Sequence, residues 1–293
     1  MEKLERCPIT DSPLSPALTC KDHTVTGDDF TVMANAEGTV LTTNPRPESD
    51  ELGTYYESDE YISHTDSNKG VLDGVYQVVR NYSLRKKRAL LEQHLSKGSI
   101  LDIGCGTGDF LLEMKSNSWA VSGMEPNDEA RKKAESKIGT KLHTNPALTD
   151  LPSGSFDAIT MWHVLEHVPD PTVTTNRIFE LLKPGGVAVI AVPNFKSKDA
   201  QIYGSLWAAY DVPRHLFHFS QAGMIGLFTG RGFNHVKNHP MVFDSYYVSL
   251  LSEKYKSGRR RWIPAFVNGL RSNLSARNSG EWSSIIYIFQ KPK

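Results

Sequence analysis

The chain has 293 residues, of which 39% are hydrophobic and 23% charged, as is typical of a globular protein with a buried core. Lysine and arginine match aspartate and glutamate at 33 each, so the formal charge is zero, which argues against a protein whose main partner is nucleic acid. No run approaches the roughly 20 apolar residues that span a bilayer, and the first residues lack the apolar segment of a signal peptide, so we expect a cytoplasmic protein without a membrane partner.

The first part of the chain predicts a small module followed by helices. Residues 1–47 are rich in Pro, Thr, Ser and Asp and contain β-like runs at 30–33 and 39–41, which predict a small irregular β module. Residues 48–98 are polar, and apolar residues recur at roughly helical spacing from Val71 to Leu95, which predicts a helical segment.

From Ser99 onward, predicted strands and helices alternate, which favours a parallel sheet covered by helices on both faces. The predicted strands cover 99–103, 119–124, 141–144, 156–162 and 186–193, and the helices between them cover 107–116, 128–137 and 172–183. After an irregular segment at 194–220, the predicted elements are a helix capped by Ser220 and running to about 231, a strand at 232–243, a helical segment at 249–274 and a last strand at 283–289. The helix at 172–183 is expected to stop at the Lys-Pro-Gly-Gly sequence of 183–186.

A glycine-rich turn follows the first strand of this alternating part. Residues 102–110 read Asp-Ile-Gly-Cys-Gly-Thr-Gly-Asp-Phe, so the glycines are Gly104, Gly106 and Gly108. Glycine permits positive φ and close backbone approach to a ligand, and the helix that follows offers free N–H groups. The G-x-G-x-G spacing differs from the G-x-G-x-x-G of a dinucleotide site.

This pattern resembles motif I of the class I S-adenosylmethionine (SAM)-dependent methyltransferases of bacteria. The resemblance implies a Rossmann-like α/β fold with a seven-stranded sheet, its last strand antiparallel, over residues 99–293. It also implies SAM as the cofactor, S-adenosylhomocysteine as the product, and a helical lid formed by residues 48–98.

Several segments are expected to hold the cofactor at the carboxyl edge of the sheet. Asp102 is expected to orient loop amides or the methionyl ammonium, and Glu125, 21 residues after Gly104, to accept hydrogen bonds from both ribose hydroxyls. The other residues expected at the cofactor are Cys105, Phe110, Pro126, Asn127, Ala147, Leu148, Trp162 and His163.

Two polar segments are candidates for the chemistry. Residues 163–168 (His-Val-Leu-Glu-His-Val) resemble the ubiquinone-biosynthesis type of O-methyltransferase, which reads Glu-His-Val there. His167 is a candidate base, or Glu166 and His167 position the acceptor; a metal site and a purely structural role are the alternatives. In the second segment, 211–216, His215 is a candidate base oriented by Asp211, and Arg214 is a candidate for binding a carboxylate or phosphate.

His215, His167 and Glu166 are therefore the predicted catalytic residues, and no metal is expected. Tyr61 and His64, on the predicted lid, are further candidates for the acceptor pocket, as are Tyr246 and Tyr247, for which core packing is the alternative.

Residues 1–47 resemble the zinc-ribbon segment that precedes this domain in many bacterial proteins. Cys7-Pro8 is retained, but Thr10 occupies the second ligand position and the later cysteine pair falls near Asn35 and Gly38. Neither side chain can replace a thiolate, so we expect a degenerate, metal-free module.

The predicted reaction is methyl transfer to a small-molecule or sugar-linked acceptor, with a hydroxyl favoured. The Asn/Asp-Pro-Pro-Tyr/Phe signature of amino methylation is replaced by Met-Trp-His-Val at 161–164. A catalytically silent SAM-binding regulatory protein and a sugar C-methyltransferase are the alternatives. The chain is expected to be a monomer or homodimer.

Overall fold

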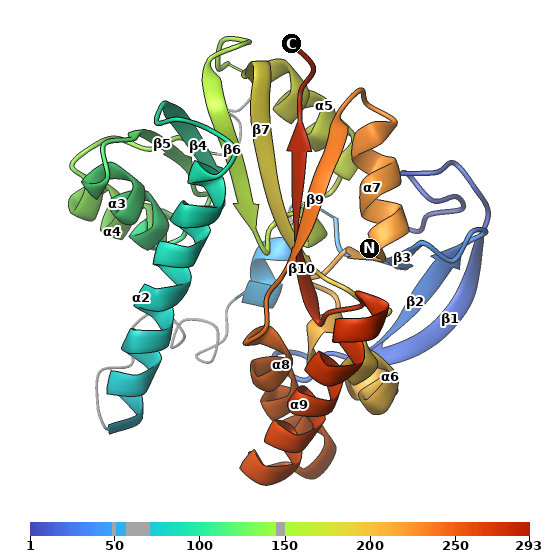
Figure 1. The fold of residues 1–293 in the computed structure, drawn as a ribbon. Helices are drawn as coiled ribbons and strands as arrows, with labels where there is room; N and C mark the ends of the chain where they lie inside the picture. The colour runs from blue at the N-terminus through green and yellow to red at the C-terminus, as the bar shows by residue number, and fades with distance from the viewer. Residues whose placement is uncertain (49–50, 57–70, 145–149) are drawn as a thin grey trace.

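A computed structural model describes residues 1–48, 51–56, 71–144 and 150–293. Its centre is a sheet of six strands in the order β5-β4-β6-β7-β10-β9 (Figure 1). The strands are β4 (Ser99–Ile103), β5 (Ala120–Met124), β6 (Phe156–Trp162), β7 (Leu182–Pro193), β9 (Asn234–Pro240) and β10 (Ser284–Gln290). Strands β4, β5, β6 and β7 are parallel, and β10 runs antiparallel to both of its neighbours. The predicted parallel sheet with an antiparallel last strand is confirmed.

Both faces of this sheet are buried. Along β7, Ala188, Ile190 and Val192 pack into one apolar cluster, while Val187 and Val189 pack into another. Successive strand residues point to opposite faces, so a continuous apolar run is what a strand covered on both sides requires.

The third predicted strand is wrong within the described residues. Residues 141–144 make only an isolated parallel bridge, between His143 and Met124 at the end of β5. The segment alternates polar residues around a single apolar one, Leu142, which packs with Ala134 and Ile138. Among the described residues, the central sheet therefore has six strands where the resemblance implies seven.

The helices differ from prediction mainly at their ends. The α-helices are α2 (Val71–Glu92), α3 (Asp109–Ser116), α4 (Asp128–Ile138), α5 (Pro171–Leu181), α6 (Lys198–Tyr203), α7 (Gln221–Thr229), α8 (Asp244–Ser257) and α9 (Trp262–Ser279). Ser220 caps α7 as predicted, accepting the Gly223 N–H. The Lys-Pro-Gly-Gly sequence belongs to β7, which begins directly after α5. None of the described helices has both the length and the apolar character needed to cross a membrane.

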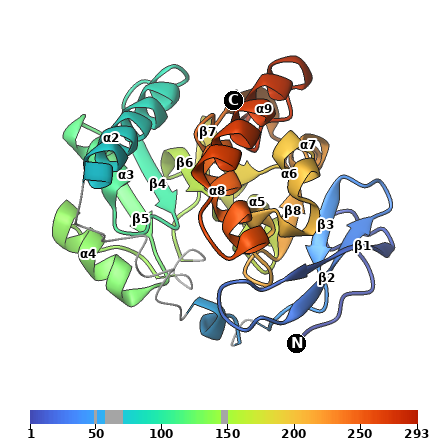
Figure 2. The same ribbon diagram turned by 90° about the horizontal axis from the view of Figure 1, so that it is seen from below.

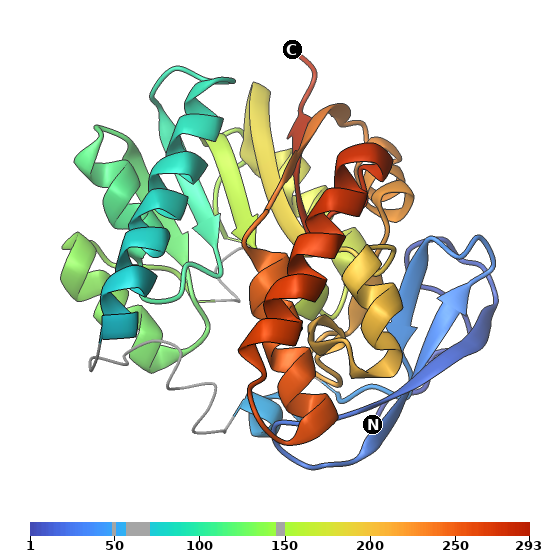
Figure 3. The same ribbon diagram turned by 60° about the horizontal axis from the view of Figure 1, so that its bottom comes forward.

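Figure 2 separates α2, α3 and α4 on one side of the molecule from the N-terminal strands on the other, with α8 and α9 between them. Figure 3 shows α9 running beside α8, against which it packs. The predicted helical segment at 249–274 is thus two helices, and α8 begins at Asp244, five residues before the predicted start.

The N-terminal residues form a second, four-stranded sheet. Its order is β1-β2-β3-β8, with β1 (Leu14–Lys21), β2 (Asp29–Asn35), β3 (Val40–Thr43) and β8 (Phe217–Phe219). Strand β1 was not predicted, because it contains Pro16 and most of its residues are exposed, so its sequence lacks the regular alternation of apolar and polar residues that marks a half-buried strand. The fourth strand comes from the later part of the chain, so the sheet of residues 1–47 is completed by residues beyond it.

The positions that resemble zinc ligands are joined by hydrogen bonds. Asn35 Nδ2 donates to the Thr10 hydroxyl at 3.3 Å and to Glu37 at 2.8 Å, while Asn35 Oδ1 accepts the N–H groups of Thr39 and Val40. These hydrogen bonds join the end of β2 to the start of β3, at positions where a zinc ribbon has thiolate ligands. Cys7 is buried in the apolar core.

Candidate functional site

The glycine loop connects β4 to α3 with three residues at positive φ. Gly104, Gly106 and Gly108 have φ of 71°, 54° and 80°. A Cβ atom on Gly104 would lie 2.4 Å from Val164 Cγ2, and one on Gly108 would lie 2.8 Å from Ala134 Cβ. A Cβ on Gly106 would meet no atom within 4 Å. The loop is therefore packed at its two ends and open at its middle.

Glu125 stands at the end of β5 beside this loop. Its side chain is buried, and its two carboxylate oxygens accept the N–H groups of Gly106 and Asn127, each at 2.9 Å. A carboxylate has about four acceptor sites, so capacity remains for two hydroxyls. Pro126 and Asn127 are exposed at the same tip, where the Asn127 side chain caps α4 by accepting the Ala130 N–H.

Asp102 lies buried at the end of β4, under the loop. The Thr160 hydroxyl donates to its Oδ1 at 2.5 Å. Burial raises the pKa of the Asp102 carboxyl to about 7, although the bond from Thr160 opposes the rise. Cys105 and Phe110, two other predicted cofactor residues, are also buried here. The Cys105 N–H donates a hydrogen bond to the Met124 carbonyl, and the Phe110 ring lies edge to face with Trp162, with ring centroids 5.3 Å apart.

A lysine that the sequence did not single out occupies the space beside Trp162. Lys87 of α2 places Nζ 4.1 Å from the centroid of the Trp162 ring, a cation–π contact. Burial lowers the pKa of Lys87, against the attraction of Asp102 and Asp244. Helix α2 thus brings a cation to an aromatic face with acids nearby.

These residues fit S-adenosylmethionine. The open middle of the glycine loop leaves room for a ligand. The Trp162 ring and the nearby Asp102 and Asp244, which attract the Lys87 ammonium, would attract a sulfonium in the same way. Trp162 Nε1 is buried and has no hydrogen-bond partner among the described residues. Ala147 and Leu148, expected at the adenine, lie outside the described residues.

A cavity of about 330 Å³ opens next to His163, at the carboxyl ends of β6 and β7. Its wall combines the segment after β6, the 208–215 segment, the start of β10 and one side of α8. The lining residues are Thr24, His163, Glu166, Pro193, Ala208, Ala209, Asp211, Arg214, His215, Asp244, Tyr247, Val248, Leu251, Tyr255 and Ser284. Of the α8 residues in this wall the sequence indicated only Tyr247, because the helix was expected to begin at 249 and residues 244–248 were not predicted to be helical.

His163, which lines this cavity, is held between two carboxylates. Nε2 lies 3.0 Å from Asp244 Oδ2, and Nδ1 lies 3.4 Å from Glu166 Oε1. Burial opposes charge on the ring, but the two carboxylates outweigh it and raise the pKa of His163 to about 10. The ring is therefore an imidazolium at neutral pH. Its backbone has φ of 57°, which is uncommon for a residue other than glycine.

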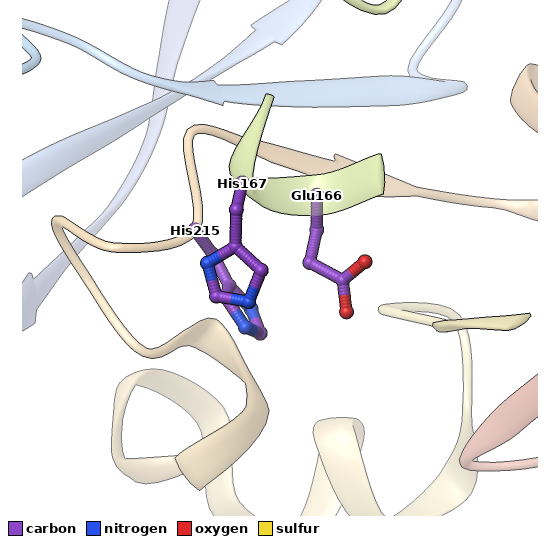
Figure 4. Close-up of side chains that lie close together, drawn as sticks. All are labelled: Glu166, His167 and His215. Carbon is purple, nitrogen blue, oxygen red and sulfur yellow. The ribbon is translucent and has the colours of Figure 1, made fainter. Parts of the chain in front are cut away.

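The three predicted catalytic side chains come together. Glu166 and His167 belong to the short helix η3 (Leu165–His167), and His215 comes from the segment before β8 (Figure 4). The rings of His167 and His215 meet edge to face, with centroids 4.5 Å apart. Burial, with the neighbouring His167, lowers the pKa of His215 to about 4, so this ring is neutral near pH 7.

Asp211 and Arg214 take roles that differ from the predicted ones. The Ala209 carbonyl, 2.9 Å from His215 Nδ1, orients that ring, while Asp211 Oδ2 is 3.9 Å from Nε2. The Arg214 side chain is 3% exposed and pairs with Asp211 at 2.6 Å and with Asp22 at 3.2 Å. Arg214 lines the cavity, but its guanidinium is engaged in linking the acceptor wall to the N-terminal sheet.

The predicted role of Tyr246 at the acceptor pocket is not supported by its position. Its ring stacks on Phe266 at 5.3 Å and its backbone closely approaches Gly269, so it faces α9. The neighbouring Tyr247 lines the cavity instead. Tyr61 and His64 lie outside the described residues.

Known proteins share parts of this chain. The family model described as a methyltransferase domain matches residues 76–238, more than half of the chain. A ubiquinone biosynthesis O-methyltransferase from Psychrobacter cryohalolentis is 32% identical over 130 residues, which are 41% of this chain and 51% of that protein. One from Rickettsia akari is 28% identical over 160 residues, or 52% of this chain and 63% of that protein. The chain spans about half the length of the first relative and less than two thirds of the second.

A solved structure shares the fold. A SAM-dependent methyltransferase from Archaeoglobus fulgidus superimposes with a TM-score of 0.51 at 18% identity, over 72% of this chain and 94% of that one. The family match covers the glycine loop, Glu125 and the segment after β6. The chain therefore belongs to the methyltransferase-domain family, and its α/β fold is that of the solved SAM-dependent methyltransferase.

Proposed function

We propose that the protein transfers the methyl group of SAM to a hydroxyl of a small molecule held in the cavity beside His163. The observation that carries this proposal is the position of the cavity. His163 and Glu166, which line it, directly follow β6 at the sheet edge where the glycine loop and Glu125 also lie. Ligands of open α/β sheets bind at this edge.

The loop from Gly104 to Gly108, Glu125 and Trp162 would hold the cofactor, whose sulfonium supplies an activated methyl group. The chain's own task is then to align an acceptor with that group and to exclude water. A cavity of about 330 Å³ suits a small acceptor rather than a polymer segment.

The buried cluster of Glu166, His167 and His215 would receive the proton of the acceptor hydroxyl. His215 Nδ1 lies 2.9 Å from the Ala209 carbonyl, which can only accept a hydrogen bond, so the hydrogen sits on Nδ1 and the lone pair on Nε2. His215 lines the cavity with this ring neutral at pH 7. The related proteins that are named O-methyltransferases support a hydroxyl acceptor.

Calorimetry with S-adenosylhomocysteine tests the cofactor half of the proposal. We expect the wild type to bind, and Glu125→Ala to bind at least ~10-fold more weakly because two ribose hydroxyls lose their acceptor. His239→Gln, on β9 and outside the cavity lining, is the control and should bind as the wild type does. No binding at ~1 mM would contradict the proposal.

Mass spectrometry of hydroxylated small-metabolite pools, incubated with enzyme and SAM, tests the acceptor half. We expect a product heavier by one CH₂ group, formed at least ~100-fold more slowly by His215→Gln although this variant still binds S-adenosylhomocysteine. Cofactor binding without any methylated product would favour the silent, regulatory alternative.

A further inference from the structure

Glu166, His167 and His215 have the arrangement of a metal-ligand set. Each offers one ligand atom, and the three atoms lie within 4.8 Å of one another. Figure 4 shows the side chains of Glu166 and His167 extending from the same side of η3, with the His215 ring next to that of His167. In a tetrahedral zinc site with bonds of about 2.1 Å, two ligand atoms lie about 3.4 Å apart, so the three side chains would have to draw together by about 1 Å to close the site.

The hydrogen bonds of both rings leave the same nitrogen free. His167 Nδ1 lies 3.0 Å from the Arg214 carbonyl oxygen, and His215 Nδ1 lies 2.9 Å from that of Ala209. A carbonyl only accepts, so His215 carries hydrogen on Nδ1 and a lone pair on Nε2. His167 Nδ1 also lies 2.9 Å from the Tyr56 hydroxyl, and this ring has the same tautomer when the Tyr56 oxygen and the Arg214 carbonyl both accept from its N–H. Metal-bound histidines typically donate their other N–H to a carbonyl or carboxylate in this way.

Glu166 supplies the independent observation that points to a ligand. Its side chain is 1% exposed, and neither carboxylate oxygen has a hydrogen-bond partner among the described residues; His163 lies 3.4 Å from one of them. A buried carboxylate without hydrogen bonds is costly, and the His163 imidazolium, which is shared with Asp244, compensates it only in part.

Negative charge is in excess around the cluster. Two cations are each shared by two carboxylates: Arg214 by Asp211 and Asp22, and His163 by Asp244 and Glu166. Lys87 of α2 also attracts Asp244, so these four carboxylates exceed the three cations by one charge, which a cation at the cluster would offset.

We propose that Glu166, His167 and His215 bind one divalent transition-metal ion, of which Zn²⁺ is the representative, at the wall of the acceptor cavity. Two imidazoles and a carboxylate suit Zn²⁺, Mn²⁺, Fe²⁺ or Co²⁺ better than Mg²⁺ or Ca²⁺, which prefer oxygen ligands only. The sequence analysis expected no metal because the residue that completes the set, His215, lies 48 positions after His167.

Three protein ligands leave a coordination position open. Glu166 and His215 both line the cavity, so this position faces the acceptor. With the metal bound, His215 Nε2 would be a ligand and no longer a free base; the metal would instead lower the pKa of a bound acceptor hydroxyl, whose proton would pass to water. This step rests on the proposed function, whereas the metal site rests on the cluster alone.

Calorimetric titration of chelator-treated protein with Zn²⁺ tests the site. We expect one ion per chain with a dissociation constant below ~1 μM. Glu166→Gln and His215→Gln, which keep side-chain size, should each weaken binding at least ~100-fold. His239→Gln is the control, because His239 lies near His94 in another imidazole pair and should leave the titration unchanged. Equal binding by all four proteins, or no stoichiometric binding by the wild type, would overturn the proposal.

S-adenosylhomocysteine binding, measured on the same samples, separates the two proposals. A variant that loses Zn²⁺ but still binds S-adenosylhomocysteine is folded and supports the metal site. If a variant loses both Zn²⁺ binding and S-adenosylhomocysteine binding, the absorption spectrum of the Co²⁺-loaded wild type tests the metal site instead. A ligand-field band of Co²⁺ bound by imidazole nitrogen supports the site, and the spectrum of hexaaqua Co²⁺ overturns it. Failure of S-adenosylhomocysteine binding in the wild type would instead contradict the proposed function.

Discussion

Replacing Asp22 with asparagine should weaken the link between the N-terminal sheet and the acceptor wall. The Asp22 carboxylate is fully buried and accepts the N–H groups of Thr24, Val25 and Thr26, and Arg214 pairs with it at 3.2 Å. Burial alone would raise its pKa, but the bonds from Thr26 and Thr24 and the charge of Arg214 outweigh burial and lower it from 3.8 to about 2.

The size of the effect follows from that shift. At about 1.36 kcal/mol for each pKa unit, the ionised carboxylate contributes about 2.5 kcal/mol to the free energy of unfolding near pH 7. Because the folded-state pKa is below the unfolded value, this contribution is present above pH ~4 and is lost as the pH falls through ~2. About half of it should be gone near pH 3.

Urea unfolding of Asp22→Asn and wild type at pH 7 and pH 3 tests this. We expect a loss of about 2–3 kcal/mol at pH 7 and about half of that at pH 3. Asp28→Asn is the control, because the exposed Asp28 should change stability by less than ~0.5 kcal/mol. A loss below ~0.5 kcal/mol, or one independent of pH, would refute the reasoning.

Two other features of the site can be tested directly. Gly104→Ala should lower the free energy of unfolding by about 2–4 kcal/mol, since its Cβ would lie 2.4 Å from Val164 at φ of 71°; Gly106→Ala, with no atom within 4 Å, should cost only about 1 kcal/mol. Equal losses in urea unfolding would contradict this. In NMR spectra, the His163 ring should stay protonated from pH 6 to 8, because its pKa is about 10. Its contribution to stability should be complete below pH ~6.5 and fall as the pH rises towards 10. Asp244→Asn should lower that pKa, and an unchanged titration would contradict the pairing.

The central part of the fold could be predicted because its signals are local. The apolar run of β7, the glycines at 104–108 and the Ser220 cap each act within a few residues. Glu125 was found because the length of a β-α-β unit places an acid at the next strand tip. The family match and the observed parallel order agree with that part of the prediction.

The rest depends on contacts between distant residues. Arg214 was interpreted as an anion ligand because nothing near it in sequence indicates Asp22, its partner 192 positions away. Of the two adjacent candidates, only Tyr247 lines the cavity, because a helix turns by about 100° at each residue and Tyr246 faces α9. Lys87 reaches Trp162 only through the packing of α2, which the helical spacing alone does not specify.

The pairing of β3 with β8 constrains the order in which the chain can fold during its synthesis. Val40 pairs with Phe219 and Leu41 with His218, so the N-terminal sheet cannot close until the ribosome has released residue 219. At typical synthesis rates that delay is roughly 10–40 s, during which β3 has an unpaired edge. The acceptor wall forms later still, because it also needs α8 and the first residue of β10, which are synthesised after β8. A nascent chain stalled before β8 should therefore carry a glycine loop without an acceptor cavity.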